Sequence, residues 1–222
     1  MPVLEFPTSK SVELEIEDEM IALYQSINSL RSSTQKNKVI QFMSPDGEQG
    51  TSTIALELAR VAALKYTKSV LLLDADLRKL DQKLFFNITI EHSLEETIRA
   101  GAPVDKALYQ IRNSSLFLSR FFKDSGSISQ FLAPSDIDDL LEKLRTRFDF
   151  IFIDSPPENV FSIGLATSTS VNGVILVLDA EKTCLNEAKN ITDKITKNGG
   201  KVLGVVVNKQ RNHIPEFISK RI

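Results

Sequence analysis

The residues best suited to bind a phosphate group are four small ones, Gly50-Thr51-Ser52-Thr53. The apolar run 39–43 precedes them and an amphipathic run follows, which indicates a strand, a loop and a helix N-terminus. At such a junction unpaired backbone N–H groups and the positive end of the helix dipole converge on one point. The nucleotide-binding form of this motif is G-x-x-x-x-G-K-[ST]. Gly50 and Ser52 match it, but Thr51 stands at the lysine and Pro45 at the first glycine, so we expect a phosphate cradle without its fixed positive charge.

Three acidic side chains are expected at the same edge of the fold. Asp74 and Asp76 follow the apolar run 69–73, and Asp154 follows the run 148–153. In an open α/β sheet, ligands bind at the carboxyl ends of the strands. An acid at the position of Asp154 can hold the Mg²⁺ shell near a triphosphate, and Asp74 and Asp76 can orient a Mg²⁺-bound water or accept a proton.

Each of these features also has an ordinary structural explanation. A Thr or Ser before a helix is a common N-cap, and an Asp that ends a strand commonly caps the next helix. The combination is more specific, because the loop, the Asp74-x-Asp76 pair and the acid before Pro156-Pro157 occur in this order in one chain. Together they favour a nucleotide site.

The elements that must position these residues alternate between strand and helix. This alternation predicts an α/β fold with a mostly parallel central sheet and helices on both faces. We expect strands at 39–43, 69–74, 115–121, 148–153, 173–179 and 202–207. Longer helices are expected at 16–30, 51–66 and 183–198, and shorter ones after the capping boxes Ser93-x-x-Glu96 and Ser135-x-x-Asp138.

The domain organisation is expected to be simple. Residues 1–15 have the pattern of an N-terminal arm. Residues 16–222 have that of a single domain with a short C-terminal helix at 214–222. The segment 80–135 has the weakest pattern. The apolar residues of the 16–30 run share one helical face, which either packs on the domain or serves self-association.

Composition excludes several classes of function. With 27 Lys+Arg against 29 Asp+Glu, the chain lacks the charge excess of a nucleic-acid-binding protein. No apolar run reaches the roughly 18 residues of a membrane span, and the first residues lack the apolar segment of a signal peptide. One cysteine and two histidines make a disulfide framework or a zinc site unexpected. We therefore expect a cytoplasmic protein.

Several stretches together resemble the cytoplasmic domain of the bacterial tyrosine kinases (BY-kinases) of capsule and exopolysaccharide synthesis, within the MinD/ParA-like group of P-loop ATPases. The stretches are GEQGTST, VLLLDADLRKL, FDFIFIDSPP, VNGVILVLDAEKT and LGVVVN, and the resemblance spans nearly all of 16–210. It implies a P-loop NTPase-like fold, ATP or ADP with Mg²⁺ as ligands, and a membrane polysaccharide co-polymerase or chain-length regulator as partner. It also implies a place at the inner face of the plasma membrane.

The resemblance assigns a role to each matching residue. The phosphates would be contacted by Gly50, Thr51, Ser52 and Thr53. The edge of the adenine base would be contacted by Asn208. Mg²⁺ would be held, directly or through water, by Ser52, Asp74, Asp76 and Asp154. In an active enzyme Asp76 would be the catalytic base.

The chain also departs from the BY-kinase pattern. Thr51 replaces the phosphate-binding lysine, and Glu48 stands at a glycine position of the loop. The oligomerisation motif Glu-x-x-Arg-x-x-Arg, aligned on Glu19, has Ala22 and Gln25 instead of its arginines. The C-terminal tyrosine cluster is absent, since the tyrosines of this sequence are Tyr24, Tyr66 and Tyr109.

Three functions are compatible with these observations. The first is a degenerate family member that regulates or assists a membrane co-polymerase without effective kinase activity. The second is an active ATPase or kinase in which Lys182, or a lysine of a neighbouring subunit, supplies the missing charge. The third is a MinD/ParA-like positioning ATPase that attaches to the membrane through 214–222.

Overall fold

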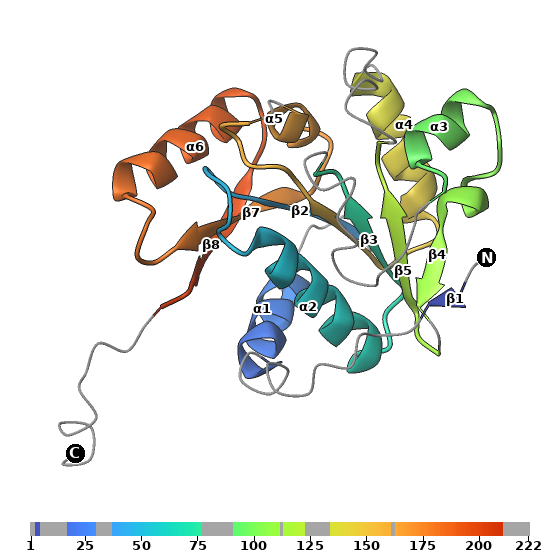
Figure 1. Ribbon diagram of the computed structural model, residues 1–222, viewed down its shortest axis with the longest axis horizontal. Coiled ribbons are helices and arrows are strands. Elements are labelled where there is room, and N and C mark those ends of the chain that lie inside the picture. Colours follow the sequence, from blue (N-terminus) through green and yellow to red (C-terminus); the bar gives the residue numbers. More distant parts are fainter. Residues whose placement is uncertain are drawn as a thin grey trace.

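The structure, a computed structural model, describes residues 3–4, 17–29, 37–76, 91–111, 113–122, 134–160 and 163–210. One sheet of eight strands crosses the molecule in the order β1-β4-β5-β3-β6-β2-β7-β8 (Figure 1). All neighbouring strands are parallel except the β4–β5 pair. The strands are β1 Val3–Leu4, β2 Lys38–Met43, β3 Val70–Asp74, β4 Tyr109–Ile111, β5 Leu116–Arg120, β6 Phe150–Asp154, β7 Gly173–Asp179 and β8 Val202–Asn208.

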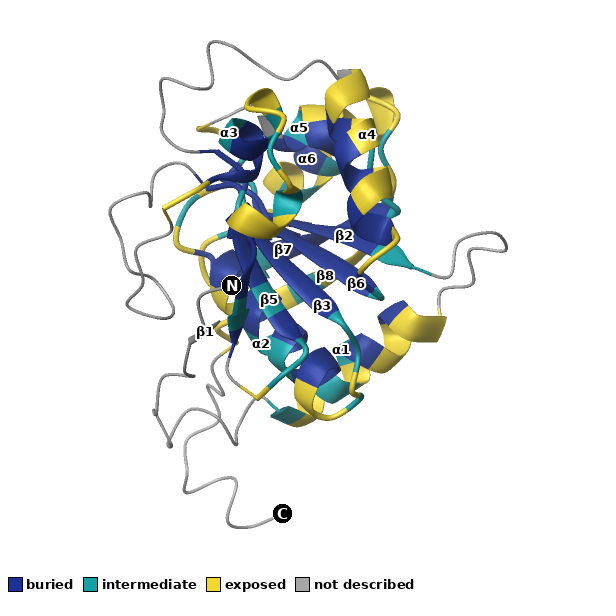
Figure 2. Ribbon diagram, turned by 90° about the vertical axis from the view of Figure 1, so that its right-hand side faces the viewer, coloured by how far each residue is buried: buried dark blue, intermediate teal, exposed yellow. Residues whose placement is uncertain are grey.

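Helices cover both faces of the sheet, as the sequence predicts for an α/β fold. Helices α1 and α2 lie on one face, and α3 to α6 lie on the other (Figures 1 and 2). The helices are α1 Glu17–Ser29, α2 Thr51–Leu64, α3 Leu94–Arg99, α4 Pro134–Arg145, α5 Ile163–Thr167 and α6 Leu185–Lys197, with a 3₁₀ turn at Val104–Ala107.

The central strands are buried on both faces, which explains their continuous apolar sequences. In β2, Ile40 and Phe42 point toward α1 and α2, whereas Val39 and Met43 point toward the opposite face. All five residues of β6 are buried. Because parallel strands share one direction, their carboxyl ends meet at one edge of the sheet, and the candidate site residues follow those ends.

Most of the elements expected from the sequence are present, and one start is wrong. Ser93 Oγ accepts a hydrogen bond from the Glu96 N–H at 3.1 Å, which confirms the cap of α3. The cap expected at Ser135 is wrong, because α4 already begins at Pro134 and Ser135 lies inside its first turn. Proline suits that place, since the first helical N–H has no intrahelical acceptor.

Four short elements went unpredicted: β1, β4, α5 and the 3₁₀ turn have two to five residues each, too few for a clear period. Within the expected N-terminal arm, Val3 pairs with Gln110 and Leu4 with Ile111 to form β1. The helix expected at 214–222 lies outside the described residues. Among the residues that are described, no helix has the length and apolar character needed to cross a membrane.

The apolar face of α1 is packed inside the chain, against α2 and the sheet. Met20, Tyr24 and Ile27 are buried, and Leu23 packs against the same core. The Tyr24 ring stacks on Tyr66 with centroids 4.0 Å apart and lies 5.6 Å from the Phe150 ring. Burial raises the pKa of the Tyr24 phenol. The first of the two interpretations of this helix is therefore confirmed for its described residues, and self-association remains a prediction.

The C-terminal end of α1 is held by the first residue of β2. The Lys38 ammonium donates to the carbonyl oxygens of Ile27 at 3.0 Å and Asn28 at 2.8 Å. These carbonyls belong to the last helical turn, which has no intrahelical donors for them. Burial lowers the pKa of Lys38.

Tyr24→Ala tests this docking of α1. We expect it to lower the free energy of unfolding by about 3–5 kcal/mol, as for other large side chains removed from a core. Urea denaturation would measure the loss, with the exposed Glu19→Ala on the same helix as a control. A loss close to that of the control would show that α1 is not packed as described.

Candidate phosphate-binding site

The loop 44–50 joins the central strand β2 to α2 at the carboxyl edge of the sheet. Strand β2 lies between β6 and β7, so the loop is flanked by the ends of both. Gly50 has a left-handed backbone with φ +88°, and the Ile54 N–H donates to its carbonyl at 3.0 Å, the first hydrogen bond of α2. Thr51 and Ser52 are buried in the first helical turn, whereas Thr53 is exposed.

One side of the loop is held by the segment after β6. The N–H groups of Glu158 and Asn159 donate to the carbonyls of Ser44 at 3.0 Å and Pro45 at 3.3 Å. The side-chain amide of Asn159 also donates to Asp46 Oδ1 at 2.8 Å. This segment follows Pro156-Pro157, so the turn that the prolines impose carries it onto the loop.

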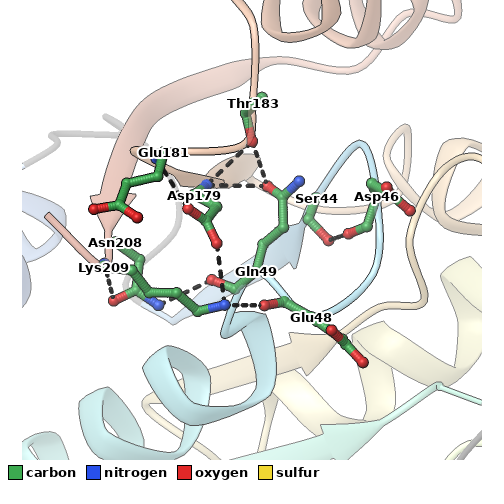
Figure 3. A network of polar contacts seen from close by, with 9 residues as sticks. All are labelled: Ser44, Asp46, Glu48, Gln49, Asp179, Glu181, Thr183, Asn208 and Lys209. Carbon is green, nitrogen blue, oxygen red and sulfur yellow. Dashed lines mark hydrogen bonds and ion pairs between the residues drawn. The ribbon is translucent and has the colours of Figure 1, made fainter.

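The other side of the loop is held by residues at the ends of β7 and β8 (Figure 3). Gln49 is buried, and its Oε1 accepts hydrogen bonds from Asp179 N at 3.2 Å and Thr183 Oγ1 at 3.1 Å. The Asn208 amide donates to the Gln49 carbonyl at 2.9 Å. The Lys209 ammonium donates to the Glu48 carbonyl and lies 3.1 Å from Asp179 Oδ2.

Asp179 is the acid at the centre of this second set of contacts. It is 2% exposed, and its Oδ1 accepts a hydrogen bond from the Glu181 N–H at 3.0 Å. That hydrogen bond, followed by the Lys209 ammonium, lowers the pKa of Asp179. The lowered pKa extends the pH range over which the carboxylate is charged, and with it the ion pair with Lys209, toward acid.

The other acids lie along the same edge, at the ends of β3 and β6. Asp74 and Asp154 are partners in register on these strands, and the Ala75 N–H donates to the Asp154 carbonyl at 2.9 Å. Asp154 is also in register with Phe42 of β2, directly before the loop. Asp76 is buried, and its N–H donates to Asp74 Oδ1 at 2.9 Å. The acids singled out in the sequence therefore share one edge with the loop.

The donor groups at this edge suit a hydrated magnesium ion. Among the described residues, no three His, Cys, Asp or Glu side chains form a group that could hold a metal on its own. Mg²⁺ usually takes one or two protein ligands, several waters and phosphate oxygens. The hydroxyl of Ser52 and the strand-end carboxylates fit that pattern, and the assignment of Mg²⁺ to Ser52, Asp74, Asp76 and Asp154 stays a prediction.

Sequence reasoning missed the polar residues that hold the loop: Gln49, Asn159, Asp179, Thr183 and Lys209. Asp179 ends an apolar run as Asp154 does, so the rule that found one acid could have found the other. Asn208 was expected to contact the edge of the adenine base. Both ends of its amide are bonded within the protein, because Oδ1 also accepts the Lys209 N–H at 2.9 Å.

Gly50→Ala tests how tightly Asn208 packs on the loop. A Cβ at position 50 would lie 2.1 Å from Asn208 Nδ2, which is impossible without displacement. Gly101→Ala is a matched control, since Gly101 has a similar φ of +63° but open space around the added atom. We expect both to lose about 1–2 kcal/mol to backbone strain, and Gly50→Ala to lose more.

Thermal or urea denaturation of the two variants and of Gly50→Ala/Asn208→Ala would measure the difference. Shortening Asn208 in the double variant should recover part of the extra loss. Equal destabilisation of the two single variants would contradict the close contact between Gly50 and Asn208.

Comparison with known proteins places this geometry among P-loop NTPases. The ParA family model, described as NUBPL iron-transfer P-loop NTPase, matches residues 35–220. The putative tyrosine-protein kinase CapB of Staphylococcus aureus is 29% identical over 172 residues, which cover 78% of this chain and 75% of CapB. The tyrosine-protein kinase ptk of Acinetobacter johnsonii is 25% identical over 209 residues, 94% of this chain but 28% of the length of ptk.

Solved structures show the same fold. The chimerical protein CapA2B2 superposes with a TM-score of 0.80 at 21% identity, over 95% of this chain and 94% of that one. The septum site-determining protein MinD from Pyrococcus horikoshii OT3, solved in complex with Mg-ADP, gives a TM-score of 0.63 at 19% identity, over 83% and 76% of the two chains.

Proposed function

Because the chain belongs to the ParA family of P-loop NTPases, with bacterial tyrosine kinases among its relatives, we propose that it is a nucleotide-responsive partner in capsule or exopolysaccharide synthesis with weak or absent kinase activity. The observation that carries this proposal is the residue at the start of α2. Thr51 is buried at the first helical position, where the motif has its phosphate-binding lysine, and it directly follows Gly50, the left-handed residue that begins α2.

The loss of the lysine affects binding and catalysis differently. A hydrogen bond to a charged group is worth about 1.5–3 kcal/mol in binding, so its absence weakens nucleotide binding without abolishing the amide cradle. In phosphoryl transfer, a cation that stabilises the developing charge can be worth roughly 10³–10⁵ in rate. A site of this composition is therefore better suited to sensing a nucleotide than to transferring its phosphate.

The remaining groups have defined tasks in the proposed site. Backbone N–H groups at 50–53 would bind the phosphate chain, and the Ser52 hydroxyl with the strand-end acids would hold Mg²⁺. The bound ion would neutralise phosphate charge. Asp76 would accept the proton of an attacking hydroxyl only in an active enzyme, and ATP or ADP is the proposed ligand.

The proposed partner is a membrane polysaccharide co-polymerase or chain-length regulator at the inner face of the plasma membrane. Support comes from the relative named CapB and from the CapA2B2 chimera, whose name joins two Cap proteins. A co-polymerase that changes its affinity for this chain when ADP or ATP is added would be the expected behaviour. Phosphotyrosine on that partner, formed with this chain as the only kinase, would contradict the proposal.

A second candidate function is ATP hydrolysis with a cation supplied from another position. The observation in its favour is charge near the loop: Lys209 contacts the Glu48 carbonyl, and the positive charge of Lys182 contributes to the lowered pKa of Asp179. Steady-state ATP turnover at saturating Mg²⁺ separates the two functions. The third function, that of a MinD/ParA-like positioning ATPase attached to the membrane, depends on the tail 214–222, which lies outside the described residues.

Restoring the lysine tests the proposed function directly. Thr51→Lys should raise the affinity for Mg-ADP by about 10–100-fold, the ratio that corresponds to a recovered charge-assisted hydrogen bond. Isothermal titration calorimetry would measure it, and Thr51→Val, which keeps the shape and removes the hydroxyl, is the control. If wild type and Thr51→Lys both fail to bind Mg-ADP, the loop is not a phosphate cradle.

A further inference from the structure

Two consecutive residues at the end of β8 hold two consecutive carbonyl groups of the loop. The Lys209 ammonium donates to the Glu48 carbonyl, and the Asn208 amide donates to the Gln49 carbonyl at 2.9 Å. Figure 3 shows both side chains reaching the loop from the β8 side. We propose that Asn208 and Lys209 are positioning residues that aim the loop's N–H groups at a bound diphosphate. This inference rests on the proposed function of the loop and adds a part that the sequence motif lacks.

The argument begins with the geometry of the peptide bond. In a trans peptide, the C=O and N–H groups point in opposite directions, and the described chain has no cis peptide. Holding the Glu48 carbonyl toward β8 therefore turns the Gln49 N–H to the opposite side of the loop. Holding the Gln49 carbonyl does the same for the Gly50 N–H. Both amides then face the same side of the loop, away from β8, so that one bound phosphate group could accept both hydrogen bonds.

The backbone conformation of the loop agrees with this role. Glu48 has φ +59° and Gly50 has φ +88°, so left-handed residues flank Gln49 on both sides. Left-handed residues within a turn bring successive N–H groups into one concave surface that binds anions. Glu48 adopts a conformation that favours glycine, and the carbonyl contact with Lys209 helps to hold it there.

Lys209 is itself held in a fixed place. Its backbone is left-handed, with φ +57°, and its N–H donates to Asn208 Oδ1 at 2.9 Å. Its ammonium lies 3.1 Å from Asp179 Oδ2, and that carboxylate is almost fully buried. Gln49 connects the same group of residues, because its Oε1 accepts the Asp179 N–H. The position of the ammonium is therefore set by the ends of β7 and β8 together.

These contacts distinguish positioning from direct replacement of the lost lysine. The ammonium of Lys209 already contacts a carboxylate and a backbone carbonyl of the loop. The Asp179 charge offsets its positive charge, so Lys209 offers a phosphate little net attraction. Lys209 thus acts on the shape of the loop. The exposed Lys189 of α6, which belongs to no candidate site, serves as a control for charge alone.

The test compares Lys209→Met with Lys189→Met in the full chain, using inorganic pyrophosphate and Mg-ADP as probes. Each variant removes one positive charge and keeps most of the apolar stem. We expect Lys209→Met to lower the affinity for both probes by at least about tenfold, the size of one lost hydrogen bond. Lys189→Met should change it less than about twofold. Equal losses would indicate a general charge effect and overturn the positioning role.

A readout without ligand completes the test. Backbone ¹⁵N order parameters, which report how firmly the direction of each N–H is held, should be lower at Gln49 and Gly50 in ligand-free Lys209→Met than in wild type, with those of the core strands unchanged. Unchanged order parameters at the two loop amides would overturn the proposal. Lys209→Gln, whose amide is one atom shorter and cannot make the same contact, gives a second polar variant if the methionine variant folds poorly.

The two proposals fail in different ways. If wild type binds neither probe, the proposed nucleotide function fails, and the aiming of amides at phosphate fails with it. If wild type binds both probes and Lys209→Met binds them equally well, the nucleotide function stands and only the positioning role is overturned.

Discussion

The hydrogen bonding of the loop carbonyls is the constraint on which the candidate site depends. A loop that points its N–H groups inward must direct its carbonyls outward, where buried carbonyls need donors. The carbonyls of residues 44 and 45 receive backbone N–H groups from 158–159, and those of 48 and 49 receive side chains from the end of β8. The shape of the loop is thus fixed from two sides without any ligand.

This arrangement separates two properties that the P-loop motif combines. The backbone supplies an anion-binding surface through N–H groups and the helix dipole, whereas the lysine supplies charge. In this chain the backbone of the loop is held by a network of Gln49, Asp179, Asn208 and Lys209. The lysine that would supply the charge is replaced by Thr51. A protein of this kind can keep a weakened affinity for nucleotide while losing most of the chemistry, because catalysis depends on charge more steeply than binding does.

Much of the fold could be predicted, because the central strands are long apolar runs buried on both faces. Strands β2, β3, β6, β7 and β8 and helices α1, α2 and α6 occur close to their expected bounds. The secondary structure around β4 could not be predicted from the sequence. Strand β4 has three residues and pairs antiparallel with β5 and parallel with β1, a pairing decided by residues distant in the chain. The start of α4 was missed by two residues because Pro134 can occupy the first turn as readily as a serine can precede it.

The sequence by itself determined which residues lie at the edge of the sheet. A polar residue that ends a buried parallel strand must emerge at the carboxyl edge, which places Asp74, Asp154 and the loop after β2 together. Only the tertiary structure decided what holds the loop. Asn208 and Lys209 contact carbonyls 159 and 161 residues away in the chain, and no local pattern encodes such a pairing. It arises because β8 lies beside β7, and β7 beside β2, so that side chains distant in sequence meet across adjacent strand ends.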